Sequence, residues 1–194
     1  MKYKITTTTK SIDGRTYYQI QALKDFSKVK KGDLGGWIQS EKNLSQEGVC
    51  WVSGDGDARV SDKARVSDNA WVSENARVWG NAQVYDKAQV FGEAQVFGKA
   101  HVWGDASVRG EAQVWGEAQV FGEAQVFGEA HVWGDASVRG EAQVSGDVGL
   151  IEIDFDLEGD FNGILKALLK KDNLPILLGI HPDLDKIIHY KLSH

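Results

Sequence analysis

Valine recurs at every sixth position through the middle of the chain, from Val60 to Val144, and Leu150 continues the phase. Alanine stands four residues after each valine as far as Ala142, and glycine occupies the second position after valine in eleven of the fifteen units. Six residues advance about 600° around an α-helix, so these valines would spiral around a helix instead of forming an apolar stripe. Short strands separated by corners fit the period. We therefore expect valine and alanine to point inward and glycine to form the bends.

These units resemble the hexapeptide repeat of left-handed parallel β-helices, in which three hexapeptides form one triangular coil. The resemblance, and not the period itself, implies the left-handed coil and its three faces. Residues 60–149 hold fifteen units and would form five coils. At a strand spacing of about 4.8 Å these coils make a prism roughly 24 Å tall. With the residues before them, the sequence predicts an all-β solenoid of about five to six coils over residues 44–150.

Different patterns flank this array. Residues 1–43 are predicted to form a β-rich head, because two β-prone runs flank Asp13-Gly14, a dipeptide typical of hairpin turns. The step from Val52 to Val60 is eight residues instead of six, which predicts an insertion at one corner. Residues 151–158 alternate apolar and acidic side chains, as a strand does. Apolar residues at helical spacing in 161–169 and 184–192 predict helices, so residues 151–194 should form a strand and a helical cap.

The string GDLGGWI, followed by NLS, by WV and by the array, is similar to small phage- and prophage-encoded proteins of this architecture. This resemblance implies a protein made in a bacterial host. The N-terminal residues lack the apolar core of a secretory signal, and no apolar run approaches the roughly 18 to 20 residues that a membrane span needs. A single cysteine, Cys50, excludes an internal disulfide framework. We expect a soluble cytoplasmic protein with no membrane partner.

Aromatic residues directly follow many of the valines and should therefore point outward. With three units per coil they stack in columns, of which one holds Trp79, Phe97, Trp115 and Trp133, and another holds Tyr85, Trp103 and Phe121. A third column holds Phe91 and Phe127 with Arg109 between them. One interpretation is structural, since each stacked pair stabilises neighbouring coils by about 0.5 to 1.5 kcal/mol. Four large rings exceed the apolar patch that a monomer usually exposes, so we favour contact with further copies, as a dimer or trimer, or with a partner protein.

The formal net charge of the chain is -6, yet residues 105–160 carry thirteen acidic groups and only two basic ones. Thirteen carboxylates along roughly 15 to 20 Å approach the charge density of duplex DNA. The candidate surface residues in this acidic block are Glu111, Glu117, Glu123 and Glu129. Such a rod would mimic nucleic acid and inhibit a host defence protein that binds nucleic acid; the other interpretation is that the acids only keep the aromatic columns soluble. The sign of the charge disfavours direct binding of nucleic acid.

Enzymes that share the hexapeptide fold are often trimeric acyltransferases, whose catalytic histidine lies on a loop or in a groove between subunits. Here no loop interrupts the array after Val60, and its only histidines, His101 and His131, fall on different faces. A zinc-dependent hydratase of this fold would need three histidines that meet across an interface. We therefore assign no catalytic residue, no metal and no cofactor.

One segment partly matches a calcium-binding loop. Acidic residues occupy several ligand positions of an EF-hand, namely Asp154, Asp156, Glu158 and Asp160. The twelfth position, which requires a bidentate glutamate, is Leu165. We interpret the segment as a strand with an acidic face and keep calcium binding as the weaker interpretation.

The sequence therefore predicts a non-catalytic binding or scaffold protein that acts through the outer faces of a β-helix, as a homo-oligomer. An acidic mimic of nucleic acid and a trimeric acyltransferase-like enzyme are the two alternatives. The mimic would bind a host protein, whereas the enzyme would bind and turn over an acyl donor.

Overall fold

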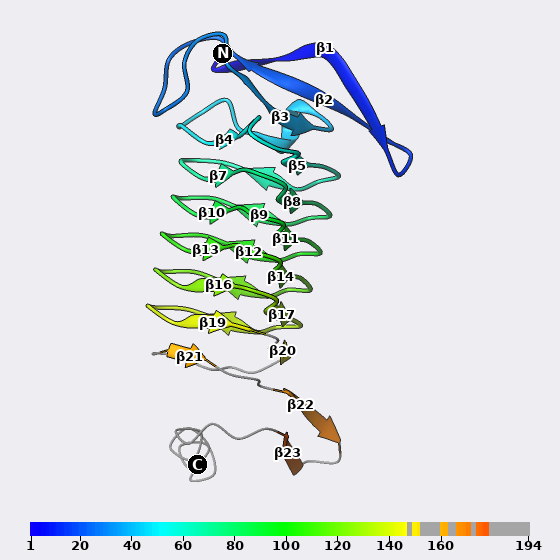
Figure 1. The fold of residues 1–194 in the computed structure, drawn as a ribbon, viewed down its shortest axis with the longest axis vertical. Helices are drawn as coiled ribbons and strands as arrows, with labels where there is room; N and C mark the ends of the chain where they lie inside the picture. Colours follow the sequence, from blue (N-terminus) through cyan, green and yellow to red (C-terminus); the bar gives the residue numbers. More distant parts are fainter. Residues whose placement is uncertain (147–148, 152–159, 163–165, 172–173, 179–194) are drawn as a thin grey trace.

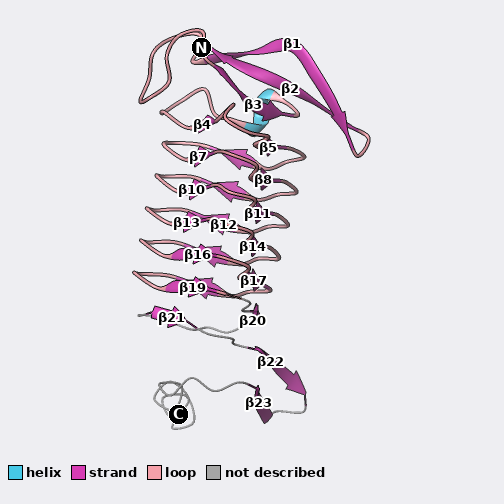
Figure 2. Ribbon diagram, in the orientation of Figure 1, coloured by secondary structure: helices cyan, strands magenta, loops and turns pink. Residues whose placement is uncertain are grey.

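The computed structural model of the chain describes residues 1–146, 149–151, 160–162, 166–171 and 174–178 (Figure 1). These residues form a parallel β-solenoid of about six coils with an N-terminal hairpin at one end. The one helical segment among them is the 3-10 helix η1 (Glu41–Asn43) (Figure 2). The predicted solenoid and hairpin are thus confirmed. Within the described ranges, no helix is long and apolar enough to cross a membrane.

The coils stack their short strands into three faces, each named here after one of its strands. The β5 face contains β3 (Leu34–Ile38), β5 (Arg59–Val60), β8 (Arg77–Val78), β11 (Gln95–Val96), β14 (Gln113–Val114), β17 (His131–Trp133) and β20 (Gly149–Ile151). The β6 face contains β6 (Arg65–Val66), β9 (Gln83–Val84), β12 (His101–Val102), β15 (Gln119–Val120) and β18 (Ser137–Val138). The β7 face contains β4 (Trp51–Val52), β7 (Trp71–Val72), β10 (Gln89–Val90), β13 (Ser107–Val108), β16 (Gln125–Phe127), β19 (Gln143–Ser145) and β21 (Asp160–Asn162).

The core is a stack of identical apolar layers. Valine pairs with valine one coil away, as Val60 does with Val78 and Val78 with Val96. Backbone hydrogen bonds join the coils, and one example is the bond from the amide of Arg59 to the carbonyl of Ala76 at 3.0 Å. Every valine and alanine of the repeat from Val60 to Val144 is buried. The predicted inward orientation is confirmed, and removal of this apolar surface from water stabilises the stack.

The second residue after each valine turns the chain at a corner. It adopts a positive φ, for example +58° at Asp62 and +72° at Gly92. Glycine enters this left-handed region without the steric cost that other residues meet. It also permits close stacking of the corners, because a Cβ on Gly92 would lie 2.8 Å from the amide nitrogen of Gly110 in the next coil. The predicted role of glycine at the bends is confirmed.

Strand β3, which includes most of the GDLGGWI string, joins the head to the solenoid. It pairs antiparallel with β2 (Arg15–Ala22), which in turn pairs antiparallel with β1 (Tyr3–Ile12), and it pairs in parallel with β5. The first rung of the β5 face therefore falls within residues that the sequence assigns to the head. A Cβ on Gly36 would lie 2.5 Å from the carbonyl oxygen of Ser53 and 2.6 Å from that of Ala58. Glycine thus lets β3 pack against the inserted corner that the long step from Val52 to Val60 predicts.

Charged contacts hold the hairpin against the first coil. The Lys10 ammonium lies 4.1 Å from the centre of the Trp37 ring and forms an ion pair with Asp57. Near the hairpin turn, Arg15 Nε lies 3.2 Å from Asp62 Oδ1 at the first corner after β5. The hairpin is therefore fixed to the solenoid by both a sheet and its side chains.

The N-terminal residues close the end of the core. Lys2 is 1% exposed, and its Nζ donates to the carbonyl oxygen of Cys50 at 2.8 Å and to that of Glu47 at 3.2 Å. The Tyr3 hydroxyl donates to the carbonyl oxygen of Leu44 at 2.7 Å. Burial raises the pKa of Tyr3 and the pKa of the Cys50 thiol. A buried thiol with a raised pKa is a poor nucleophile, so we assign Cys50 a packing role.

The C-terminal part differs from the prediction. Strand β21 pairs in parallel with β19 and continues the β7 face, and β22 (Lys166–Lys171) pairs antiparallel with β23 (Leu174–Leu178). The helix predicted over residues 161–169 is therefore wrong for the residues of that range that the structure describes. So short an apolar run fits either period, and here pairing between strands prevails over helical spacing. The second predicted helix, at 184–192, and the acidic strand residues 152–158 lie outside the described residues.

Candidate interaction surfaces

Four aromatic rings form a continuous stack beside the β5 face, and we call them the four-ring ladder: Trp79, Phe97, Trp115 and Trp133. The ring centres of Trp79 and Phe97 lie 4.4 Å apart, those of Phe97 and Trp115 5.5 Å, and those of Trp115 and Trp133 5.1 Å. The ring planes are parallel to within 6°. The stacking predicted from the 18-residue coil is confirmed, because each ring follows a valine that occupies the same place in successive coils.

The stack determines which part of each ring is accessible. All four rings are half-buried, and each inner ring is covered on both faces by its neighbours. The outward surface therefore consists of ring edges. Centres about 5 Å apart leave no gap for an inserted ring, since two stacked rings already fill that separation. A partner, including a second copy, must contact the ladder along its edges, and rings of two copies cannot interleave.

A second stack lies beside the β6 face, and we call it the three-ring ladder: Tyr85, Trp103 and Phe121. Its ring centres are 5.7 Å apart between Tyr85 and Trp103 and 4.3 Å apart between Trp103 and Phe121. Burial, followed by the nearby Asp86 carboxylate, raises the pKa of Tyr85. The predicted stacking is again confirmed.

The third column, beside the β7 face, combines two phenylalanines with an arginine. The Arg109 guanidinium carbon lies 4.4 Å from the centre of the Phe127 ring, and Nη2 donates to Gln125 Oε1 at 3.1 Å. The Arg109 guanidinium stands where a ring would stand in the stack and covers the face of the Phe127 ring. This column therefore presents less aromatic surface than the two ladders.

The two histidines of the array pack against the ladders. His101 lies edge-to-face with Tyr85 and Trp103, with centres 6.3 Å apart in each case, and belongs to the β6 face. His131 lies 5.5 Å from Trp115 and belongs to the β5 face. Their placement on different faces is as predicted. Among the described residues, no group of three histidine, cysteine or acidic side chains is arranged to hold a metal ion.

The four candidate acidic residues are exposed but do not share one row. Glu111 and Glu129 follow strands of the β7 face, Glu117 follows the β5 face and Glu123 follows the β6 face. Consecutive acids are six residues apart, so each step moves to the next corner of the prism. The block therefore surrounds the solenoid with negative charge.

Two members of the block, Asp105 and Glu117, have a lysine partner. Lys87 Nζ lies 3.3 Å from Asp105 Oδ1. Lys99 Nζ lies 2.6 Å from Glu117 Oε1 in the next coil. This hydrogen bond raises the pKa of Lys99 and lowers the pKa of Glu117. Of the calcium candidates, Asp154, Asp156 and Glu158 lie outside the described residues, and Asp160 lies in β21.

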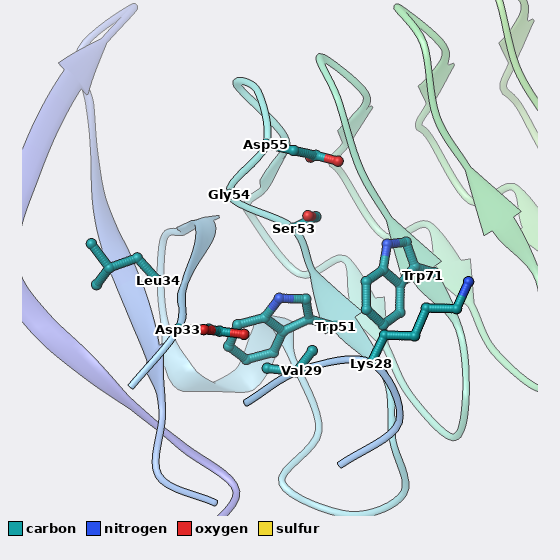
Figure 3. Close-up of a pocket in the computed structure, with 9 residues that line it drawn as sticks. All are labelled: Lys28, Val29, Asp33, Leu34, Trp51, Ser53, Gly54, Asp55 and Trp71. Atoms are coloured by element: carbon teal, nitrogen blue, oxygen red, sulfur yellow. The ribbon is translucent and has the colours of Figure 1, made fainter. Parts of the chain in front are cut away.

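A pocket of about 240 Å³ at the junction of head and solenoid was not predicted (Figure 3). Its lining comes from the segment before β3 and the first residue of β3, from β4 with the inserted corner, and from β7. The lining residues are Lys28, Val29, Asp33, Leu34, Trp51, Ser53, Gly54, Asp55 and Trp71. The one feature of the sequence that could have indicated this pocket is the pair Trp51 and Trp71. Each of these residues precedes an inward valine on the β7 face. Their proximity depends on the inserted corner, whose path the repeat does not specify.

Comparison with known proteins gives one partial similarity. No family model matches the chain. A curated protein of Escherichia coli (strain K12), named "Uncharacterized acetyltransferase YdcK", is 53% identical over 34 residues, or 18% of this chain. The chain spans about a tenth of the length of this curated relative, because the match covers 10% of it. The repeat, the solenoid and this similarity together fit the hexapeptide-repeat superfamily.

Proposed function

We propose that the protein is a non-catalytic binding or scaffold protein that acts through the outer faces of its solenoid and assembles with further copies of itself. The observation that carries the proposal is the four-ring ladder, an unbroken column of half-buried rings with their edges turned outward. Its partner is a second copy, as part of a dimer or a trimer, which covers these edges. The GDLGGWI string adds the proposal that a phage or prophage encodes the protein, and a gene remote from any such element contradicts that part.

The energetics support self-association. Covering the edges of four rings on each copy removes on the order of several hundred Å² from water, at about 25 cal/mol per Å². Gln95 and Gln113 of the β5 face stand two residues before Phe97 and Trp115, are only half-exposed and add a polar border. An apolar strip with a polar rim is the usual composition of a protein interface. The sum of ring and border contacts can exceed the entropic cost of association.

A first test measures the molar mass of the protein and its binding and turnover of acetyl-CoA in the same preparation. Light scattering coupled to size exclusion should give two or three times 21.4 kDa at micromolar concentration. A species of 21.4 kDa contradicts the self-assembly part of the proposal. Acetyl-CoA titrated into the same preparation should show no saturable binding and no turnover.

The enzymatic alternative derives its support from the name of the E. coli relative. Saturable binding of an acyl donor together with turnover would replace the scaffold proposal by a transferase. The described residues offer such an enzyme only His101 and His131 in the array, and both already pack against aromatic rings.

The second alternative, mimicry of nucleic acid, derives its support from the acidic block. Because the block surrounds the prism, a nucleic-acid groove on a host protein would contact one row and not all three. The row of Glu93, Glu111 and Glu129 has no ion pair among the described residues. Changing Glu111 and Glu129 to Gln should abolish capture of a purified host DNA-binding protein, and unchanged capture contradicts mimicry through this row.

A further inference from the structure

The pocket at the head junction combines an aromatic wall with an exposed apolar side chain (Figure 3). Trp51 is 2% exposed, and its ring is fixed by edge-to-face contacts with Tyr3 and Phe26. Trp71 is half-buried and stacks on no other ring among the described residues. Leu34 is 52% exposed, and among the described residues Met1 is the other large apolar residue that is exposed. The pocket thus has a rigid floor and a wall with aromatic surface still accessible.

Two carboxylates beside this wall are held in place by backbone amides. Asp33 Oδ2 accepts from the amide of Lys30 at 2.7 Å, and Asp55 Oδ1 accepts from the amide of Glu74 at 3.1 Å. Neither carboxylate has an ion pair with a described residue. Each therefore keeps one oxygen available for a ligand. Both are oriented before any ligand arrives.

The one cation in the lining, Lys28, does not neutralise this pair. Figure 3 shows its ammonium directed away beyond Trp71, while Asp33 lies beside Trp51 and Asp55 lies above Ser53 on the inserted corner. The lining consequently carries two carboxylates against one lysine. Its charge selects a cation, and its indole surface selects a cation with a flat, weakly hydrated body.

We propose that this pocket binds the guanidinium group of an arginine side chain presented by a partner protein. The planar group stacks against Trp71, and its N–H groups donate to the free oxygens of Asp33 and Asp55. A lysine ammonium lacks the planar fork and binds more weakly. The site shares no residue with either ladder, so it goes beyond the proposed self-assembly and does not depend on it.

The test uses the full chain and three capped amino acids as probes: N-acetyl-arginine amide, N-acetyl-lysine amide and N-acetyl-citrulline amide. Citrulline has nearly the shape of arginine without its charge. The indole N–H resonance of Trp71 is followed by NMR during titration up to concentrations on the order of 10 mM. The arginine probe should shift it saturably, the lysine probe should bind several-fold more weakly, and the citrulline probe should cause no saturable shift.

Variants locate the site. Asp55→Asn should weaken arginine binding about tenfold, because a charge-assisted hydrogen bond is lost. Asp33→Asn retains an acceptor for the Lys30 amide and should have a similar effect, which covers the case in which the first variant misfolds. Lys28→Met should strengthen binding, since a like charge is removed. Glu93→Gln, an exposed acid outside the pocket, is the matched control and should change nothing.

The proposal is overturned by any of three results. The first is the absence of a saturable Trp71 shift with the arginine probe. The second is equal binding of the citrulline probe, which would show that charge is not recognised. The third is unchanged affinity in both aspartate variants. The mass of the protein is measured in the same samples, so failure of this site and failure of self-assembly remain distinguishable.

Discussion

The second residue after each valine shows how a single side chain stabilises a corner. Most corners use glycine, but four use an acid at positive φ, namely Asp62, Asp68, Glu74 and Asp86. Asp62, Glu74 and Asp86 accept from the amide of the corner glycine one coil further on, at 3.1, 2.9 and 3.2 Å, and Asp68 accepts from the Asp86 amide at 3.5 Å. The acid thus offsets the cost of the left-handed conformation with a hydrogen bond between coils.

Two substitutions at the Glu74 corner should therefore differ in their effect on the free energy of unfolding. Glu74→Ala keeps the strained φ and loses the bond to the Gly92 amide, so it should lower the free energy of unfolding by about 1 kcal/mol. Glu74→Gly loses the same bond but removes the strain, so it should stay within about 0.5 kcal/mol of the original protein. Urea unfolding followed by fluorescence measures both, with the exposed Glu93→Ala as control. Equal effects of alanine and glycine contradict the account.

Lys99 provides a prediction about pH. Its hydrogen bond lowers the pKa of Glu117, so the pair favours the folded state above the ordinary glutamate pKa, and this contribution is lost as the pH falls through the lowered value. Lys99→Glu removes the cation and places a like charge one coil away. An NMR titration should then show a higher pKa for the Glu117 carboxyl than in the original protein. An identical pKa in both proteins would mean that the pair does not persist in solution.

At the scale of elements, the repeat was predictable because one six-residue pattern specifies strand, corner and core together. Val78 and Ala82 are buried as their positions require, and Gly80 turns the corner. The role of β3 was not predictable, since its string lacks the repeat and its place depends on contacts with residues 53–58. The described residues within 161–169 form strands and not the predicted helix, for a similar reason. The stacking of β21 on β19 and the pairing of β22 with β23 are tertiary contacts that local spacing does not reveal.

Strand β3 should be sensitive to one added methyl group. In Gly36→Ala the new Cβ meets two backbone oxygens at 2.5 and 2.6 Å, and backbone cannot move aside as a side chain can. We expect a loss of about 3 kcal/mol in the free energy of unfolding, at the upper end of typical overpacking. Gly14→Ala at the hairpin turn is the matched control, because nothing lies within 4 Å of its Cβ and only its positive φ of +73° adds a cost of about 1 kcal/mol. Similar thermal midpoints for the two variants would refute this role of β3.

At the scale of the molecule, the candidate surfaces were predictable to different degrees. The two ladders follow directly from the repeat, because rings 18 residues apart must stack once three units form a coil. The position of each acid follows from the same arithmetic, which places Glu117 and Glu123 on corners other than that of Glu111 and Glu129. The pocket beside Trp71 did not follow, since the inserted corner and the segment before β3 meet there only in the folded protein.

In the proposed assembly, the edges of the four-ring ladder are the surface through which copies associate. The most direct measurement is the light-scattering mass of the original protein beside two variants that each lose two rings. Trp115→Ser with Trp133→Ser interrupts the four-ring ladder, whereas Trp103→Ser with Phe121→Ser interrupts the three-ring ladder and serves as the control. Circular dichroism confirms that each variant keeps its β-structure. We expect the original protein and the control to share an oligomeric mass and the four-ring variant to fall to 21.4 kDa. A four-ring variant that keeps the original mass contradicts the proposed assembly, and so does an original protein that is itself monomeric.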